Sequence, residues 1–361
     1  MTDLTHRVQF FLGANSAEGF SSLYDQWIDQ RSIQAFYVIK GGAGCGKSTL
    51  MGRVARDMEA EGYAVEYIRC SGDPDSLDGI FIPQKGAAMV DGTAPHGMDP
   101  AFTGATGHYI DLGEGYDRKA LFLMREEIIE AAQAYRACYP QSYRCIRGAE
   151  ESWRRGRLPL HTEETLEKAR KRASGLLSRE RKGDRTGTGR RARRFLGGVT
   201  CQGRILLEET LSTLCERGYE IRDTCGLAGV FLRHLEAGFL ESGYDVIACP
   251  DPVNPNRLAH LLIPARSLAF VCGPVTRKDF RSVRTESFVE KAAWQEGRSF
   301  LRLSNRVAEE LLAEAVEHLA QAKAHHDALE ELYHPHMDFS RAQEVEMRTA
   351  EEILSLPDVA V

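Results

Sequence analysis

A glycine-rich loop in the first part of the chain has the residue types and spacing that bind a polyphosphate. Residues 41–48 read GGAGCGKS and fit the pattern G-x-x-x-x-G-K-[ST]. The glycines let successive backbone N–H groups point toward an anion, Lys47 would reach the β- and γ-phosphates, and Ser48 would offer its hydroxyl to Mg²⁺. The expected nucleotide-binding residues are Gly41, Gly42, Ala43, Gly44, Cys45, Gly46, Lys47, Ser48 and Thr49.

The segments on both sides of this loop are the ones that the chemistry needs. Residues 35–40 (AFYVIK) are rich in β-branched and aromatic side chains and predict a strand. Residues 50–58 place their apolar side chains on one face and predict a helix, whose positive N-terminal end would face the phosphates. The alternative is a glycine-rich turn between two core elements, and the full match in a strand–loop–helix setting favours nucleotide binding instead.

A second candidate residue, Asp91, ends a short apolar segment. Residues 87–91 (AAMVD) predict a strand whose last residue is a carboxylate, the arrangement known as Walker B. Such a carboxylate would bind Mg²⁺ directly or through water, or polarise the attacking water. The alternative is a turn or helix-capping aspartate. We expect Lys47 and Asp91 to be catalytic and Ser48 and Asp91 to bind Mg²⁺, with ATP as the nucleotide.

Further candidates lie in the connections around these strands. Residues 63–70 predict a strand, and the following segment, 71–83, is rich in turn formers and carboxylates. It would lie at the C-terminal edge of the sheet, where open α/β sheets bind ligands. A carboxylate there could orient water or a second ligand, and a histidine after Asp91 could contact a phosphate, although most isolated histidines do not. These candidates are Asp73, Asp75, Asp78 and His96.

The composition is ordinary for a globular protein. The 361 residues are 43% hydrophobic and 27% charged, and no apolar run approaches the roughly 20 residues of a membrane span. The first residues have no signal-peptide pattern, and nine cysteines occur without a C-x-x-C pair. We therefore expect a reduced, cytoplasmic protein without a zinc site or a disulfide framework.

The net charge of −6 hides an asymmetry. Residues 141–194 contain 17 Lys/Arg against 7 Asp/Glu, which leaves the rest of the chain strongly acidic. This composition predicts a basic polar linker over residues 156–192, between a phosphate-loop domain (1–155) and a second domain with a helical tail (193–361). A basic linker could bind nucleic acid electrostatically, but it has no interleaved aromatic residues for base stacking, so a solvated linker is favoured.

The second half repeats the first at a nearly constant offset. Residues 11–19 match 195–203, 37–40 match 219–222, 73–83 match 254–264, and 88–92 match 269–273. Four collinear matches indicate two copies of one α/β unit, and we expect the two halves to pack on each other. The fold class expected is α/β, with two tandem three-layer α/β/α units, mainly parallel sheets, and helices after each unit.

The differences between the copies concern the residues that bind phosphate. Through this alignment Lys47 becomes Gly229, Ser48 becomes Val230, Gly46 becomes Ala228, Gly41 becomes Asp223 and Asp91 becomes Cys272. The second copy has thus lost its lysine, its hydroxyl and its carboxylate, and has gained an acid where phosphate would lie. One unit charge at about 4 Å is worth roughly 4 kcal/mol at an effective dielectric near 20, about a thousandfold in affinity. We expect the second copy to fold without binding phosphate.

Two helical patterns and a group of histidines lie outside these motifs. Apolar residues at i, i+3, i+4, i+7 and i+8 predict an amphipathic helix over residues 20–28, and helical patterns follow residues 117 and 286. Four histidines in the tail form a loose cluster: His325, His326, His334 and His336. A metal site would prefer regular i, i+4 spacing backed by carboxylates, so exposed histidines at a helix end are the favoured interpretation.

Several segments together carry a resemblance to a known family. They are residues 11–15 (FLGAN), 41–49 (GGAGCGKST), 70–79 (CSGDPDSLDG) and 91–96 (DGTAPH). In these segments the chain resembles an uncharacterised bacterial family, mainly from Gram-positive organisms, of ATPases with two tandem P-loop domains. The resemblance implies ATP binding and names no substrate. In many relatives the second loop looks intact, whereas residues 223–231 here depart from the pattern.

We expect an ATPase that uses the N-terminal site with Mg²⁺, the second half being a regulatory or structural pseudo-NTPase. One of Arg277, Lys278 or Arg281 could act as an arginine finger or its lysine equivalent. Two alternatives remain open, a small-molecule or nucleotide kinase and a non-hydrolysing, nucleotide-gated binding protein. A GTPase is disfavoured because there is no N-K-x-D segment, and an ABC-type ATPase because there is no L-S-G-G-Q segment.

Overall fold

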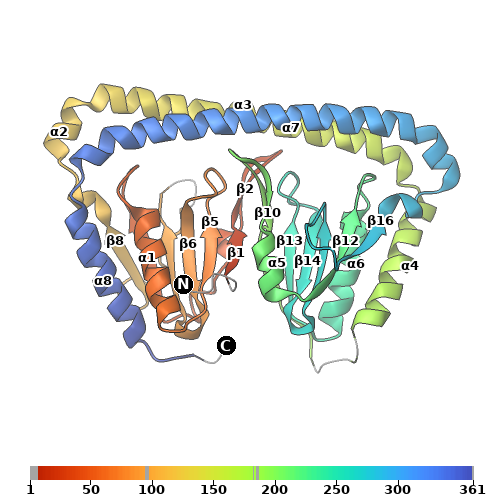
Figure 1. The fold of residues 1–361 in the computed structure, drawn as a ribbon, viewed down its shortest axis with the longest axis horizontal. Helices are drawn as coiled ribbons and strands as arrows, with labels where there is room; N and C mark the ends of the chain where they lie inside the picture. Colours follow the sequence, from red (N-terminus) through yellow and green to blue (C-terminus); the bar gives the residue numbers. More distant parts are fainter. Residues whose placement is uncertain (1–6, 94–96, 182, 184–186, 360–361) are drawn as a thin grey trace.

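The computed structural model describes residues 7–93, 97–181, 183 and 187–359 as two α/β units joined by long helices (Figure 1). Each unit contains a six-stranded, mainly parallel sheet with helices, which confirms the expected fold class of two tandem three-layer α/β/α units. Within the described part of the chain, every helix is too short or too polar to span a lipid bilayer.

The first sheet has the strand order β1-β5-β6-β7-β4-β8. Its strands are β1 (Val8–Phe11), β4 (Ala35–Lys40), β5 (Glu66–Arg69), β6 (Leu77–Ile82), β7 (Ala87–Asp91) and β8 (Gly107–Asp111). β4 is parallel to both of its neighbours, β7 and β8, and Ile39 pairs with Asp91. The carboxyl ends of β4 and β7 therefore meet at one edge, the edge where open α/β sheets bind ligands.

The second sheet repeats this arrangement, with the order β16-β12-β15-β14-β13-β9. Its strands are β9 (Arg191–Arg193), β12 (Arg217–Arg222), β13 (Val246–Pro250), β14 (Leu258–Ile263), β15 (Leu268–Cys272) and β16 (Arg281–Arg284). In both sheets the fourth strand from one edge runs antiparallel to its neighbours, β6 in the first and β14 in the second. Each unit also has a small hairpin: β2 (Gly13–Ser16) with β3 (Gly19–Ser22), and β10 (Gly197–Thr200) with β11 (Gly203–Leu206).

The helices confirm the repeat but shift its alignment by one residue. They are α1 (Lys47–Ala60), α2 (Arg118–Leu123), α3 (Arg125–Arg157), α4 (Glu163–Glu180), α5 (Glu208–Leu214), α6 (Ala228–Glu241), α7 (Lys291–Tyr333) and α8 (Phe339–Ser355). The loop before α6 is one residue shorter than the loop before α1, so Lys47 corresponds to Ala228 and Ser48 to Gly229. The sequence alignment, which paired them with Gly229 and Val230, was wrong by one position because it carried the strand offset through the shortened loop.

The two units exchange helices. The long helices α3 and α7 pack against each other and span both units in Figure 1. α3 leaves the first unit, and the next helix, α4, packs on α6 of the second; α7 leaves the second unit, and α8 packs on α1 of the first. Each unit is therefore completed by a helix from the other half of the sequence.

The range 156–192, which the composition marks as a polar linker, contains helix α4. One face of α4 carries Ala169, Ala173 and Leu176, all fully buried in the core of the second unit. The charged residues that dominate the composition lie on its other faces, where Arg170 pairs with Glu163 and Glu167. A narrow stripe of small apolar residues is enough to dock a helix, and overall polarity conceals it.

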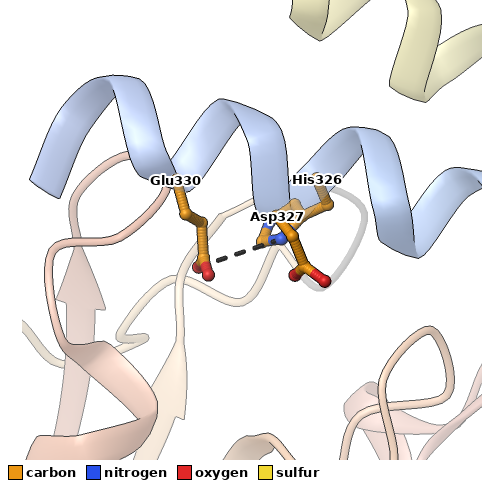
Figure 2. A group of neighbouring side chains, drawn as sticks. All are labelled: His326, Asp327 and Glu330. Atoms are coloured by element: carbon orange, nitrogen blue, oxygen red, sulfur yellow. Dashed lines mark ion pairs between the residues drawn. The ribbon is translucent and has the colours of Figure 1, made fainter.

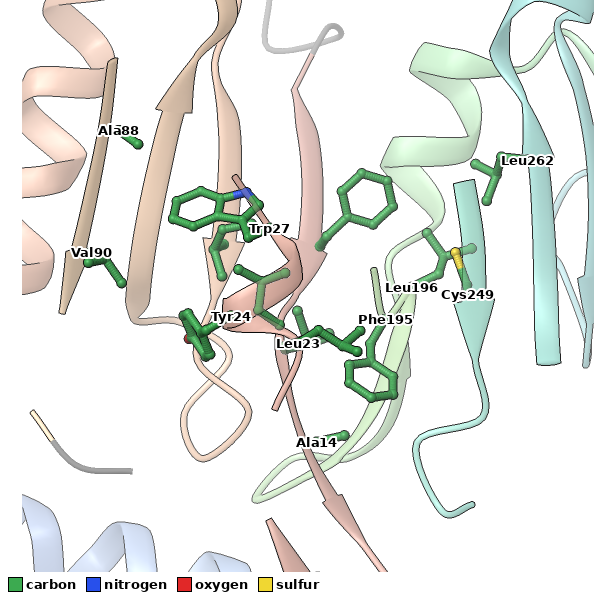
Figure 3. Close-up of a cluster of buried hydrophobic side chains, with 14 of the residues drawn as sticks. Ala14, Leu23, Tyr24, Trp27, Ala88, Val90, Phe195, Leu196, Cys249 and Leu262 are labelled. Atoms are coloured by element: carbon green, nitrogen blue, oxygen red, sulfur yellow. The ribbon is translucent and has the colours of Figure 1, made fainter. Parts of the chain in front are cut away.

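A hydrophobic core is shared between the two units. Figure 3 shows Leu23, Tyr24 and Trp27 of the first half close to Phe195 and Leu196 of the second. At its centre Phe11 and Phe195, which the sequence repeat matches with each other, form an antiparallel bridge with two N–H···O bonds of 2.9 Å. The two halves thus pack on each other, as expected.

The helix expected over residues 20–28 is not present. Phe20 lies in strand β3, where it pairs with Asn15 of β2, and only Tyr24–Gln26 forms a single 3₁₀ turn. The apolar spacing has another cause: Leu23, Tyr24 and Trp27 are buried in the shared core. The hairpin is held in turn by Asn15, whose Nδ2 donates to Ser71 O and Val199 O.

Candidate functional site

The glycine-rich loop connects β4 to α1 at the carboxyl edge of the first sheet. β4 ends at Lys40, and the helix begins at Lys47 with Gly46 as its N-cap in the left-handed region, φ +87°. Gly44 has φ +65°, and a Cβ there would lie 3.3 Å from the backbone oxygen of Glu330. Glycine is thus needed at both positions for the turn, and at Gly44 also for the close approach of helix α7.

Lys47 and Asp91 lie side by side in the site. Lys47 Nζ is 3.7 Å from Asp91 Oδ2, and each side chain is only 13% exposed. The same ammonium donates to Gly42 O at 2.8 Å and to Gly41 O at 3.1 Å, so it folds back over the loop. Asp91 Oδ1 accepts from Thr93 N and Thr93 Oγ1, which fixes the carboxylate at the end of β7.

Ser48 also lines the cavity that lies over the glycine-rich loop. Its Oγ accepts from Leu77 N at 3.0 Å, which ties the first turn of α1 to the start of β6. Ser48 and Asp91 line the same cavity, and a hydroxyl with a carboxylate is an oxygen donor set that suits Mg²⁺. These two residues would hold the ion beside the loop. Burial raises the pKa of the neighbouring Cys45 thiol, although Lys47 opposes the shift, so this thiol stays protonated at neutral pH.

The other sequence candidates have different positions. Asp73 lines the cavity, and its Oδ2 is 3.4 Å from Lys323 Nζ. Asp78 also lines it but is buried and accepts from Tyr24 OH at 3.0 Å, which indicates a structural role. Asp75 is exposed, does not line the cavity, and accepts from Gln202 Nε2. His96 lies outside the described residues.

The cavity over the loop has a volume of about 770 Å³ and is closed by distant parts of the chain. Helix α3 contributes Tyr135, Arg136 and Tyr139, α7 contributes residues between Lys323 and Glu331, the turn after α7 contributes His334, and α8 contributes Phe339. Sequence reasoning missed all of these contributions to the site. Their positions depend on the exchange of helices between the units, and no local pattern signals it.

Helix α7 places a carboxylate on the loop itself. Glu330 Oε1 accepts a hydrogen bond from Gly44 N at 3.2 Å. Figure 2 shows Glu330, Asp327 and His326 on the same side of α7, with an ion pair of 3.8 Å between His326 Nδ1 and Glu330 Oε1. A loop N–H that would meet a phosphate oxygen is therefore paired with an acid of the second half.

The second unit has a comparable cavity of about 650 Å³ but a different loop. Asp223, which stands where the first loop has Gly41, accepts from Leu227 N at 3.0 Å and from Ala228 N at 3.1 Å. Its Oδ1 also accepts from Thr285 Oγ1 at 2.8 Å. The chain's own carboxylate thus occupies the N-terminus of α6, the place where a phosphate would bind.

Among the described residues that line this second cavity, there is no lysine and no acid at the end of the central strand. Cys272 ends β15, and burial raises the pKa of its thiol well above the usual range. His260 is also buried, its Nδ1 accepts from Cys272 N, and burial lowers its pKa to about 4.

The proposed finger residues do not reach the first cavity in this structure. Arg277 pairs with Asp279 and donates to Cys215 O at 2.6 Å, and neither Lys278 nor Arg281 lines that cavity. Among the described residues, the cations that do line it are Lys47, Arg136 and Lys323.

Comparisons with known proteins give one partial match. Residues 20–79 match the family model described as Nephrocystin 3, N-terminal. This span includes the glycine-rich loop and α1 and covers well under half of the chain. No curated protein and no solved structure matches the chain significantly.

Proposed function

We propose that the chain binds Mg·ATP in the cavity over residues 41–49 and hydrolyses it. One observation carries this proposal: an unbroken phosphate loop joins β4 to α1, and its Lys47 lies 3.7 Å from Asp91 at the end of the neighbouring strand. These are the positions from which a lysine reaches the β- and γ-phosphates and a carboxylate reaches the metal ion.

The residues would divide the work as follows. Backbone N–H groups of the loop and the N-terminus of α1 bind phosphate oxygens, which take the place of Gly41 O and Gly42 O as partners of Lys47. Ser48 and Asp91 hold Mg²⁺, which neutralises charge on the phosphates when bound. Asp73, at the cavity wall, is the candidate for orienting water.

The second half would act as a regulatory or structural partner without a nucleotide of its own. Asp223 fills its helix N-terminus, so an incoming phosphate would meet a like charge. Its helices α7 and α8 nevertheless wall the first site. All nine cysteines are free, and the cytoplasm, where ATP and Mg²⁺ are abundant, is the compartment in which we place this activity.

Calorimetric titration of Mg·ATP into the purified full chain tests the proposal. We expect one site per chain in the wild type and a loss of about a thousandfold in affinity in Lys47→Ala, because the ammonium's contact with the phosphates is removed. Lys171→Ala, which changes an exposed lysine of α4 away from the cavity, is the matched control and should bind as the wild type does.

Three results would count against the proposal. Two sites per chain, or binding that survives Lys47→Ala, would mean that the second half still takes nucleotide. Binding without phosphate release in a turnover assay would favour a non-hydrolysing, nucleotide-gated protein. ADP formation that depends on an added hydroxyl acceptor, with the phosphoryl group recovered on that acceptor in place of free phosphate, would favour a kinase.

A further inference from the structure

Three metal-ligating side chains lie together on the face of α7 that closes the first cavity. The ligand atoms of His326, Asp327 and Glu330 are all within 4.8 Å of one another. Figure 2 shows them projecting from one side of the helix toward the strands of the first unit. We propose that they bind a divalent cation of the Mn²⁺ type, separate from the Mg²⁺ expected at Ser48 and Asp91, which links α7 to the bound phosphates. The link to phosphate rests on the proposed function.

Spacing along the helix supports a common ligand. His326 and Glu330 are separated by four residues and Asp327 and Glu330 by three, so all three side chains point to one side. A metal site prefers regular spacing backed by carboxylates. The four histidines of the tail lack this spacing, whereas His326 has it together with Asp327 and Glu330. The ring of His326 lies 5.2 Å from that of Tyr135 on α3, which holds the imidazole at the cavity wall.

The three side chains retain free capacity for a ligand. Glu330 contacts both Gly44 N and His326 Nδ1 through the same oxygen, Oε1, and Asp327 pairs with Lys323 through Oδ1. A carboxylate accepts about four hydrogen bonds in total, so each retains lone pairs for a cation. Their side chains are 34–48% exposed, which leaves a path for an ion to enter and leave.

The charge around the cavity also favours a second cation. Among the described residues that line it, six are carboxylates and three are lysine or arginine, an excess of three negative charges. A nucleoside triphosphate adds about four more negative charges, and one Mg²⁺ compensates only two. A cation on α7 would place positive charge on the part of the cavity wall where the carboxylates of the helix would otherwise repel the nucleotide.

The donor set indicates which cations would bind. One imidazole nitrogen with two carboxylate oxygens suits Mn²⁺ and Zn²⁺, whereas Mg²⁺ prefers oxygen donors alone. A cation held by His326 and Asp327 would also compete with Gly44 N for Glu330. It would thereby release that N–H for a phosphate oxygen, so we expect cation and nucleotide to favour each other's binding.

The first experiment uses Mn²⁺ alone. The full chain is stripped of metal with a chelator, and bound Mn²⁺ is then measured by electron paramagnetic resonance in the absence of nucleotide. We expect a saturable site that is weaker by at least roughly tenfold in His326→Ala and in Glu330→Gln, because the loss of a ligand should cost no less than the loss of an outer-shell partner. His325→Ala, which changes the exposed neighbouring histidine, should leave Mn²⁺ affinity unchanged. Lys47→Ala should retain the Mn²⁺ site, because Lys47 is proposed to bind the nucleotide and is not a ligand of this cation.

The outcomes separate this inference from the proposed function. Equal Mn²⁺ affinity in the wild type, His326→Ala and Glu330→Gln, or the absence of a saturable site in folded wild type, would overturn the cation site. If a saturable Mn²⁺ site is found but ATP does not bind, the cation site is supported and the proposed ATPase function is contradicted.

A second measurement tests the link to phosphate. ATP is titrated at fixed saturating Mg²⁺, with and without Mn²⁺. We expect Mn²⁺ to strengthen ATP binding several-fold in the wild type and in His325→Ala but not in His326→Ala. An equal effect of Mn²⁺ on all three proteins would mean that the cation on α7 does not contact the nucleotide.

Discussion

At the scale of single residues, the two loops differ in what lies at the helix N-terminus. In the first unit the loop has glycine at position 41, and the side chain of Lys47 lies beside that of Asp91. In the second, Asp223 supplies a carboxylate that accepts two backbone N–H groups of α6. A built-in carboxylate stabilises the helix by about 1 kcal/mol, as other N-terminal caps do, and excludes phosphate by charge. The same carboxylate would therefore stabilise α6 and disfavour phosphate at its N-terminus.

Another residue of the second site makes stability depend on pH. His260 is 4% exposed, and burial lowers its pKa from 6.5 to about 4. The unfolded chain therefore binds this proton more tightly than the folded chain, so stability is full above pH 6.5 and falls as pH decreases toward 4. The expected loss is roughly 3 kcal/mol. Urea unfolding of the wild type and His260→Gln at several pH values would measure it.

The variant isolates this titration from that of the carboxylates. Gln can still accept from Cys272 N but does not titrate, so the wild type should lose stability relative to His260→Gln between pH 6.5 and 4. His325→Gln changes an exposed histidine and should follow the wild type at every pH. A constant difference between the wild type and His260→Gln across this range would contradict the assignment.

The predictability of the site follows from how far apart its residues lie in sequence. Gly41 to Thr49 form one contiguous segment with a strict pattern, and Asp91 ends the strand that pairs with β4, so local patterns place both. Glu330 is 286 residues from Gly44, and no local pattern links them. His326 illustrates the same limit, because only the path of α7 across both units brings it to the loop.

At the scale of elements, the exchange of helices depends on a close contact between α3 and α7. Gly156, near the end of α3, faces Ser304 of α7, and a Cβ at position 156 would lie 2.5 Å from Ser304 Cβ. The absence of a side chain lets the two helices approach where α3 meets the second unit. Gly175 in α4 provides a contrast, since nothing lies within 4 Å of a Cβ built there.

Substitution by alanine is expected to have opposite effects on stability at these two glycines. Gly175→Ala should stabilise the protein by about 0.5–1 kcal/mol, because alanine favours the helix and costs less backbone entropy on folding. Gly156→Ala should destabilise it by about 1–3 kcal/mol, because the added methyl forces the helices apart. Chemical denaturation of both variants beside the wild type measures the difference. Equal stabilisation in both would show that α3 and α7 are not in contact at Gly156 in solution.

Elements were predicted well where local and tertiary preferences agree, and poorly where they compete. Strands 35–40 and 87–91 and helix 50–58 combine a clear periodicity with their place in the sheet, and the structure has all three. Over residues 20–28 the apolar spacing suits a helix, but pairing of Phe20 with Asn15 draws the backbone into a hairpin. In α4 the buried apolar stripe includes only Ala169, Ala173 and Leu176, and the many charged residues of the helix mask it.

At the scale of the whole molecule, the halves share both a core and their outer helices. Phe11 and Phe195 bridge the units, and Arg194 pairs with Glu66 across them at 2.5 Å, both side chains being largely buried. α8 completes the first unit and α4 the second. Neither unit buries its apolar surface without segments of the other half, so the chain should behave as one cooperative unit, unlike most proteins with two tandem domains.

Phe195→Ala tests this cooperativity. The fully buried ring lies in the shared core, so its removal should lower the free energy of unfolding by about 3–5 kcal/mol. If the halves unfold together, the slowest-exchanging amides of α1 in the first unit and of α6 in the second should lose the same protection, because both exchange only through global opening. Hydrogen exchange followed by mass spectrometry resolves the two helices. Phe300→Ala, on the exposed face of α7, is the control and should change neither helix. A loss of protection confined to α6 would show that the first unit remains folded by itself, and the exchanged helices would then join two independent domains.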